Sequence, residues 1–228
     1  MQFLERNLKE RYFGDIMDKF VILVDGHDNP IGKEEKVKCH LPNGKLHRAF
    51  TAMIFNKEGK LLLTRRSASK MLWPDDWDGT VASHPREGET YISSAERRIP
   101  EEIGITCEMN YVNKFEYHVP YRNVGSENEV CGTLIGVVDN FDESSLVLDE
   151  ISEIKWITQD ELKAEFEQNR DSYCPWMAIA LYFFADCDDT TLEKFGTLIK
   201  SWTTDELQQV YQNAIKHYIP DDNWRLIK

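Results

Sequence analysis

The segment at residues 83–105 limits what this chain can fold into more than any other part of the sequence. Its apolar residues recur three or four positions apart, which predicts a helix with one apolar face that begins near Thr90 and is stopped by Gly104. These apolar residues are Ile92, Ala95, Ile99 and Ile103. Pro100 removes one backbone hydrogen bond inside this helix, so we expect a kink or an irregular last turn.

Short runs rich in β-branched and aromatic residues predict strands on both sides of this helix. The predicted strands are residues 20–25, 49–55, 61–65, 111–119, 129–138 and 151–157. The second and third form a hairpin that turns at Gly59. Later segments predict helices, with one capping box at Thr158 and Glu161 and another at Thr203 and Glu206. This order predicts an α+β fold, an α/β/α layered domain with a mixed sheet and a helical C-terminal extension.

Composition excludes several classes of protein. The chain has 228 residues, which favours one large domain with an appendage. Its net charge of −13 would repel nucleic-acid phosphates, so we expect no nucleic-acid partner. Hydrophobic residues make up 41% of the chain and aromatic residues 11%, which is enough for a sizeable core and too much for a disordered chain.

Membrane insertion, secretion and disulfide formation are not predicted. The longest apolar run, residues 176–185, is too short to cross a bilayer. Residues 1–19 carry many charges and lack the apolar core of a signal peptide. The cysteines number five and show no CxxC spacing, which favours reduced thiols and a cytoplasmic location.

Three histidines and two glutamates form a candidate metal site. They are His40, His47, His84, Glu127 and Glu129. The two glutamates are two residues apart around a predicted strand, so their side chains project to the same face. Imidazoles mixed with carboxylates suit Zn²⁺ or Mn²⁺ better than Ca²⁺. Any one of these histidines taken alone is more often a surface residue or a hydrogen-bonded core residue.

Residues 83–105 fit the pattern Gx5Ex7REUxEExGU of Nudix proteins in most places. The matching residues are Glu89, Arg97, Ile99, Glu101, Glu102, Gly104 and Ile105. Ser83 replaces the first glycine and Arg98 replaces the first glutamate of the helix. In this pattern carboxylates from a loop and a helix hold Mg²⁺, which neutralises a diphosphate. The alternative is an exposed acidic helix with ion pairs four residues apart, and the loop residues before the helix argue against it.

Several further segments resemble the type I isopentenyl diphosphate isomerases, a branch of the Nudix superfamily. The similar segments are residues 39–40, 46–50, 64–66 with Lys70, 73–74, 83–85, 97–102, 127–131 and 175–176. They occur in the family's order across roughly residues 17–186. The resemblance implies an isomerase-like Nudix domain at residues 1–186, followed by a helical extension at residues 187–228.

The same resemblance implies roles for individual residues on an isoprenoid diphosphate substrate. The three histidines and two glutamates would hold one divalent ion, and Glu102 would help to hold Mg²⁺ on the diphosphate. The family's diphosphate-binding cations correspond to Lys36, Arg66, Lys70 and Arg98. Four cations also offset the charge of a diphosphate that the acidic chain would otherwise repel.

Enzymes of this family move a double bond by protonating an alkene, passing through a tertiary carbocation and removing a proton from the other face. The resemblance makes Glu129, aided by Tyr117, the acid. Trp176 would lie over the carbocation and stabilise it by a cation–π interaction. A position in the core is the alternative for Trp176, because it begins an apolar helix.

Ala82 occupies the position at which the family places its essential thiol, two residues before His84. An alanine cannot transfer a proton, and one acid–base group is typically worth ~10²- to 10⁴-fold in rate. Four explanations remain open: an isomerase in which Ala82 replaces a cysteine, a cyclase that begins by protonating an alkene, a Nudix hydrolase, and a catalytically silent binding protein. The retained metal ligands argue against silence, and Arg98 argues against hydrolysis.

Overall fold

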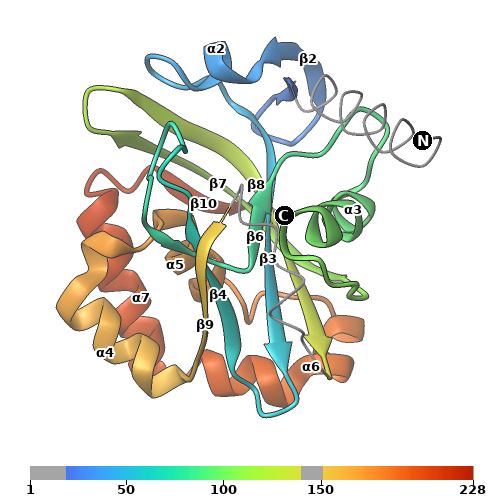
Figure 1. Cartoon of the computed structure of the whole chain (residues 1–228), viewed down its shortest axis with the longest axis vertical. Coiled ribbons are helices and arrows are strands. Elements are labelled where there is room, and N and C mark those ends of the chain that lie inside the picture. The colour runs from blue at the N-terminus through green and yellow to red at the C-terminus, as the bar shows by residue number, and fades with distance from the viewer. Residues whose placement is uncertain (1–18, 140–150, 228) are drawn as a thin grey trace, which may run out of the picture.

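Ten strands form one mixed sheet in the part of the chain that the computed structural model describes, residues 19–139 and 151–227 (Figure 1). The longest path through the sheet is β10-β7-β8-β3-β1-β2, in which β3 and β8 are parallel and the other neighbours antiparallel. The strands of this path are β1 (Phe20–Val24), β2 (Pro30–Glu35), β3 (His47–Asn56), β7 (Asn110–Tyr121), β8 (Gly125–Val138) and β10 (Trp224–Ile227). The mixed sheet confirms the predicted α+β class.

A second branch of the sheet starts at the predicted hairpin. The hairpin closes where Phe55 of β3 pairs with Leu61 of β4, after a turn in which Gly59 has a φ of 78°. Beyond this pair β4 separates from β3 and pairs with β5 and β9, while β3 pairs with β6. The strands of the branch are β4 (Leu61–Arg66), β5 (Trp77–Asp78), β6 (Val81–Ser83) and β9 (Ile151–Ile157). Two- and three-residue strands such as β5 and β6 are too short to show the alternation that predicts a strand.

Helix α3 (Tyr91–Ile103) covers one face of the sheet, on the right in Figure 1. Thr90 caps its N-terminus in a capping box with Ser93, and Gly104 ends it in the left-handed conformation with a φ of 71°. The helix continues past Pro100, whose carbonyl accepts a regular hydrogen bond from the N–H of Gly104 at 3.1 Å. This hydrogen bond of the last turn is therefore kept, because proline lacks the N–H donor but keeps its carbonyl acceptor. A kink at Pro100 stays a prediction.

The residues under α3 and those on the opposite face belong to two separate cores. Core residues under α3 include Phe50, Ala52, Ile54, Leu134, Ala95, Ile99 and Ile103. The core on the opposite face includes Ala49, Met53, Phe55, Cys131, Ile135, Met177, Leu181 and Trp202. Alternate residues of β3 and β8 point to opposite faces, so both cores use the same two strands. Helices therefore cover both faces of the sheet, as the predicted α/β/α layers require.

Four helices pack around the second core, and Figure 1 shows α4, α5 and α7 on the side of the sheet away from α3 and α6 at one end. They are α4 (Gln159–Asn169), α5 (Pro175–Tyr182), α6 (Asp189–Trp202) and α7 (Asp205–Tyr218), and a 3-10 helix at Arg170–Ser172 follows α4. The capping box at Thr158 and Glu161 is present. The predicted cap at Thr203 is wrong by one residue, because Thr204 accepts the hydrogen bond from the N–H of Leu207.

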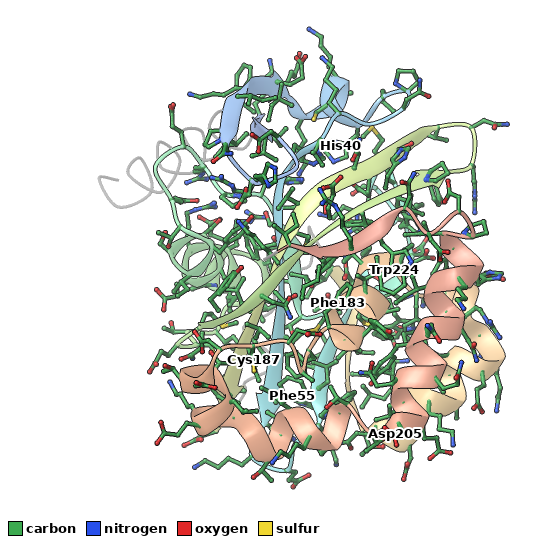
Figure 2. The ribbon with its side chains drawn as sticks, turned by 180° about the vertical axis from the view of Figure 1, so that it is seen from behind. His40, Phe55, Phe183, Cys187, Asp205 and Trp224 are labelled. Carbon is green, nitrogen blue, oxygen red and sulfur yellow. The ribbon has the colours of Figure 1, made fainter. Side chains whose placement is uncertain are left out.

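The C-terminal residues contain a strand as well as the predicted helices. β10 pairs with β7, so that Trp224 lies opposite Tyr117 in the sheet. Trp224 packs against Phe183 with ring centroids 5.3 Å apart, and Figure 2 shows these two labelled side chains close together. The helices of this segment also contribute to the second core. The boundary at residue 186 stays a prediction.

A short helix, α2 (Lys36–His40), follows β2 and was not predicted from the sequence. In residues 19–139 and 151–227, none of the helices is long and apolar enough to span a membrane.

We expect Trp202→Ala to lower the free energy of unfolding by about 3–5 kcal/mol, since a fully buried indole is removed. The rings of Trp202 and Phe55 pack with their centroids 5.4 Å apart, and the Trp202 indole donates a hydrogen bond to the carbonyl of Gly59 at 3.0 Å. Denaturant unfolding measures the change. Leu192→Ala on the exposed face of the same helix is the control and should change stability little. A loss below about 1 kcal/mol for Trp202→Ala would show that α6 is not part of the core.

Candidate functional site

Three neighbouring strands place Tyr117, Glu129 and His47 in one row across the sheet. Glu129 of β8 lies opposite Tyr117 of β7 on one side and opposite His47 of β3 on the other. The hydroxyl of Tyr117 donates a hydrogen bond to Glu129 Oε2 at 2.7 Å, and His47 Nε2 lies 3.4 Å from Glu129 Oε1. The register of the sheet therefore holds this carboxylate between a phenol and an imidazole.

Two more histidines reach the same place from outside this row. His84 follows β6, and its Nε2 lies 3.1 Å from His47 Nε2 and 3.4 Å from Glu129 Oε1. His40 ends α2, and its Nε2 lies 3.0 Å from Glu127 Oε2. Figure 2 shows His40 near the end of the sheet opposite to Phe55. The structure thus brings together all five residues of the predicted metal site.

Hydrogen bonds to the backbone orient two of these imidazoles. His40 Nδ1 lies 2.6 Å from the carbonyl of Lys36, and His47 Nδ1 lies 2.8 Å from the carbonyl of Lys45. A carbonyl only accepts, so Nδ1 carries the proton and Nε2 of a neutral ring presents a lone pair. The lone pairs therefore face carboxylate oxygens, and Glu127 Oε2 is buried without a hydrogen bond of good geometry. Such an arrangement needs positive charge among these atoms, which a bound cation or protons on the imidazoles supply.

The spacing of the donor atoms fits a metal ion. One donor atom each of His40, His47, His84 and Glu129 lies within 4.8 Å of the others. Two ligands bound ~2.1 Å from a common ion stand at most ~4.2 Å apart, and in a tetrahedral site ~3.4 Å apart. The separations of 3.1–3.4 Å between His47, His84 and Glu129 agree with that value. His40 belongs to the group only within the wider limit of 4.8 Å, so its imidazole would have to move slightly closer to share the ion. These residues can hold a metal ion.

The ionisable groups of this row and the neighbouring His84 influence one another's pKa values. Burial would raise the pKa of Glu129, but a protonated His47 and the hydrogen bond from Tyr117 keep it below the usual value. Burial, together with the negative charge of Glu129, raises the pKa of the Tyr117 hydroxyl well above its usual value. Burial and the nearby charge of Lys36 lower the pKa of His84. Tyr117 therefore remains a proton donor and Glu129 a proton acceptor in their hydrogen bond.

Tyr117 and Glu129 of this row line a pocket with a volume of about 100 Å³. Its lining combines charged, aromatic and small side chains. They are Lys36, His40, Ala49, Phe50, Arg66, Lys70, Met71, Leu72, Ala82, Ser83, His84, Tyr117, Glu127, Glu129, Cys131 and Trp176. Three of the four predicted diphosphate-binding cations and the predicted carbocation-facing indole therefore share this pocket with the predicted acid.

Glu102 and Arg98 lie outside the lining of the pocket. Both are on α3, where Arg98 Nη2 lies 2.5 Å from Glu102 Oε1 and Arg98 Nη1 lies 2.9 Å from an oxygen of Glu101. Glu102 is buried, with 5% of its surface exposed. Their predicted roles in binding Mg²⁺ and diphosphate stay predictions.

Ala82 and Glu129 line the pocket from opposite sides of β3. Ala82 on β6 pairs with Thr51 of β3, and β8 pairs with the other edge of β3. Cys131 also lines the pocket, but it lies two residues after Glu129 on the same strand. Its thiol is therefore on the side of the acid and not on the side of Ala82. Burial raises the pKa of the Cys131 thiol well above its usual value.

Asp78 is a buried residue next to this pocket that the sequence did not identify. It has 2% of its surface exposed and accepts hydrogen bonds from Trp176 Nε1 at 2.8 Å and from Arg66 Nη1 at 3.2 Å. Burial raises the pKa of Asp78, while Arg66 and Trp176 oppose that shift. An aspartate that directly follows a tryptophan and precedes a glycine carries no charge or spacing signal of its own, so only its neighbours in space reveal it.

Comparisons with known proteins agree with this fold and site. The NUDIX domain matches residues 45–177, which is more than half of the chain. A solved structure of a Deinococcus radiodurans protein superposes with a TM-score of 0.52 and 22% identity, and the match covers 66% of this chain and 90% of that protein. The domain match and this structural likeness define a Nudix fold.

Curated relatives identify the family within the Nudix superfamily to which the chain belongs. The isopentenyl-diphosphate Delta-isomerase of Haloarcula marismortui is 38% identical over 71% of this chain and 88% of its own length. Isopentenyl-diphosphate Delta-isomerase 2 of Photorhabdus laumondii is 38% identical over 70% of this chain and 89% of its own length. The isopentenyl-diphosphate Delta-isomerase of Serratia proteamaculans is 31% identical over 81% of this chain and 100% of its own length. The chain therefore belongs to the type I isopentenyl diphosphate isomerase family of the Nudix superfamily.

We expect His47→Ala and Glu127→Gln each to lower the content of divalent metal in the purified protein, because each removes one donor from the group around Glu129. Metal analysis by mass spectrometry after dialysis measures the content. His118→Ala is the matched control, since His118 lies on β7 with its Nε2 3.2 Å from the carbonyl of Asn43 and does not line the pocket. Unchanged metal content in both site variants would contradict the assignment.

Proposed function

We propose that this chain is an isopentenyl diphosphate isomerase-like enzyme that protonates the alkene of an isoprenoid diphosphate. The observation that carries the proposal is the position of Glu129, which lies between Tyr117 and His47 in the lining of a pocket that Trp176 also lines. Proton donor, aromatic face and cationic side chains in one pocket are what alkene protonation on a diphosphate substrate requires. The names of the curated relatives favour the same activity.

The donors around Glu129 would hold one divalent ion, Zn²⁺ or Mn²⁺, and Glu102 would contribute to a Mg²⁺ site for the diphosphate. The donors are His40, His47, His84, Glu127 and Glu129. When bound, these ions supply positive charge that fixes the Glu129 carboxylate and offsets the charge of the diphosphate. The convergence of imidazole lone pairs on carboxylate oxygens supports the first site.

The cationic side of the pocket would bind the diphosphate. Lys36, Arg66 and Lys70 line it, and each can make a charge-assisted hydrogen bond to a phosphate oxygen. These contacts would place the five-carbon tail between Glu129 and Trp176. Arg98 is the fourth proposed cation, and its support is the resemblance of α3 to the family pattern.

Glu129 delivers the proton in this proposal. The Glu129 carboxylate, which is ionised in the free site, first takes up a proton from solvent. The carboxyl group then gives this proton to the terminal alkene carbon, and the tertiary carbocation that forms faces the Trp176 indole. Loss of a proton from the neighbouring carbon to water on the other face completes the isomerisation and leaves the diphosphate unchanged. Ala82, which lines that other side, has no group to accept this proton. The slow step is therefore expected to be this second proton transfer.

We expect Lys70→Ala to weaken the binding of isopentenyl diphosphate by roughly 1.5–3 kcal/mol, or roughly 10- to 150-fold in Kd, since one charge-assisted contact is lost. Calorimetry in the presence of Mg²⁺ measures the change. Arg65→Ala is the control, because Arg65 lies beside Arg66 in the chain but pairs with Glu153 outside the pocket lining. Equal affinities of the two variants would contradict the assigned role of Lys70.

We expect Ala82→Cys to raise the rate of isomerisation by ~10²-fold or more, because it adds one acid–base group on the side of the pocket opposite Glu129. Exchange of solvent deuterium into the five-carbon product, followed by mass spectrometry, measures the rate. Ala82→Ser, which adds a group of similar size without the thiol, should restore much less.

An unchanged rate in Ala82→Cys with diphosphate still bound would contradict an isomerase that lacks only its thiol. The same assay with ten- and fifteen-carbon diphosphates reports the other outcomes. A cyclic product would identify a cyclase, and phosphate release would identify a hydrolase.

A further inference from the structure

Asp78 connects two parts of the pocket that are distant in the sequence. It is the second residue of β5 and pairs with Thr64 of β4. The preceding residue, Trp77, accepts a backbone hydrogen bond at 2.8 Å from the N–H of Cys174, at the start of α5. Strand β5 is therefore joined by backbone and by side chain to the helix that carries Trp176.

Asp78 accepts hydrogen bonds from three N–H donors. Oδ1 accepts from the indole Nε1 of Trp176 at 2.8 Å and from the backbone N–H of Gly79 at 2.7 Å, and Oδ2 faces Arg66 Nη1 at 3.2 Å. A neutral carboxyl group would place its own hydrogen against one of these donors, since a protonated oxygen is a donor itself. These contacts therefore favour the ionised carboxylate.

Arg66 needs such a partner because of where it lies. Its guanidinium group is 5.2 Å from the ring centroid of Trp176, and it is fixed by hydrogen bonds to the carbonyls of Trp73 and Leu72 at 3.0 and 3.1 Å. An unbalanced positive charge so close to the indole would repel a second cation near the same ring. The carboxylate of Asp78 contacts both groups and offsets this charge.

We infer that Asp78 is a positioning residue that makes the Trp176 side of the pocket selective for a cation. Its carboxylate fixes the indole by the N–H edge, increases the electron density of the ring through that hydrogen bond, and balances Arg66. The inference rests on the proposed function, because a cation arises in the pocket only if the alkene is protonated. It goes beyond that function by assigning a role to a carboxylate that does not line the pocket.

The test compares two diphosphates that differ in the charge of the tail. One is isopentenyl diphosphate, with a neutral tail, and the other carries a protonated tertiary amine in place of the branched carbon. We expect Asp78→Asn to raise the Kd of the amine compound by about tenfold or more and that of the neutral compound by less than about threefold, because the substitution removes one charge and little volume. Calorimetry measures both constants.

Asp75→Asn is the matched control. Asp75 is exposed in the segment just before β5 and has a φ of 63°, a conformation that asparagine also adopts. It removes the same charge and should leave both affinities unchanged. An equal loss for both compounds in Asp78→Asn, or no loss for either, would overturn the inference, because a purely structural role cannot distinguish the two tails.

A measurement on the unsubstituted protein covers the case in which Asp78→Asn does not fold. The indole N–H signal of Trp176, assigned in an NMR spectrum by its loss in Trp176→Phe, should move further on binding the amine compound than on binding the neutral one. Equal shifts would overturn the inference. Failure of the unsubstituted protein to bind either diphosphate would instead contradict the proposed function.

Discussion

The hydrogen bond between Tyr117 and Glu129 depends on the register of three strands, and the remainder of the site is arranged around it. A shift of β8 by one residue would turn Glu129 to the α3 side of the sheet, because successive residues of a strand point to opposite faces. His47 would then face a valine, since Val130 follows Glu129. Correct pairing of β7, β8 and β3 is therefore a condition for the site to exist.

Buried charge is the second physical condition. Glu127, Glu129 and Asp78 are each at most 7% exposed, and an isolated buried carboxylate is very unfavourable. Each of these carboxylates lies beside an imidazole, a phenol, an indole or a guanidinium group. The pocket thus brings both signs of charge close together, with Lys36 near His84 and Arg66 against Trp176. The cations suit the diphosphate of the proposed substrate, and the carboxylates offset their charge where a carbocation would form.

The positions of α3 and of the long strands could be predicted, because their patterns extend over many residues. The start at Thr90 and the stop at Gly104 were confirmed, as was the capping box at Thr158. Elements of two to five residues, such as β5, β6, β10 and α2, were not predicted, because so few residues do not define a hydrophobic period. Yet these short elements supply Asp78, Ala82 and His40.

The sequence by itself determined which residue types are present, how they are spaced and which family they resemble, because these are properties of the chain order. From it came the histidines and glutamates of the candidate metal site, the cations of the pocket and the alanine at position 82. Only the tertiary structure decided that Ala82 and Cys131 line the pocket on different sides of β3, and that Asp78 lies against Trp176, 98 residues away in the chain. The physical reason is that such contacts depend on strand register and on the packing of α5 against the sheet, which no local pattern encodes.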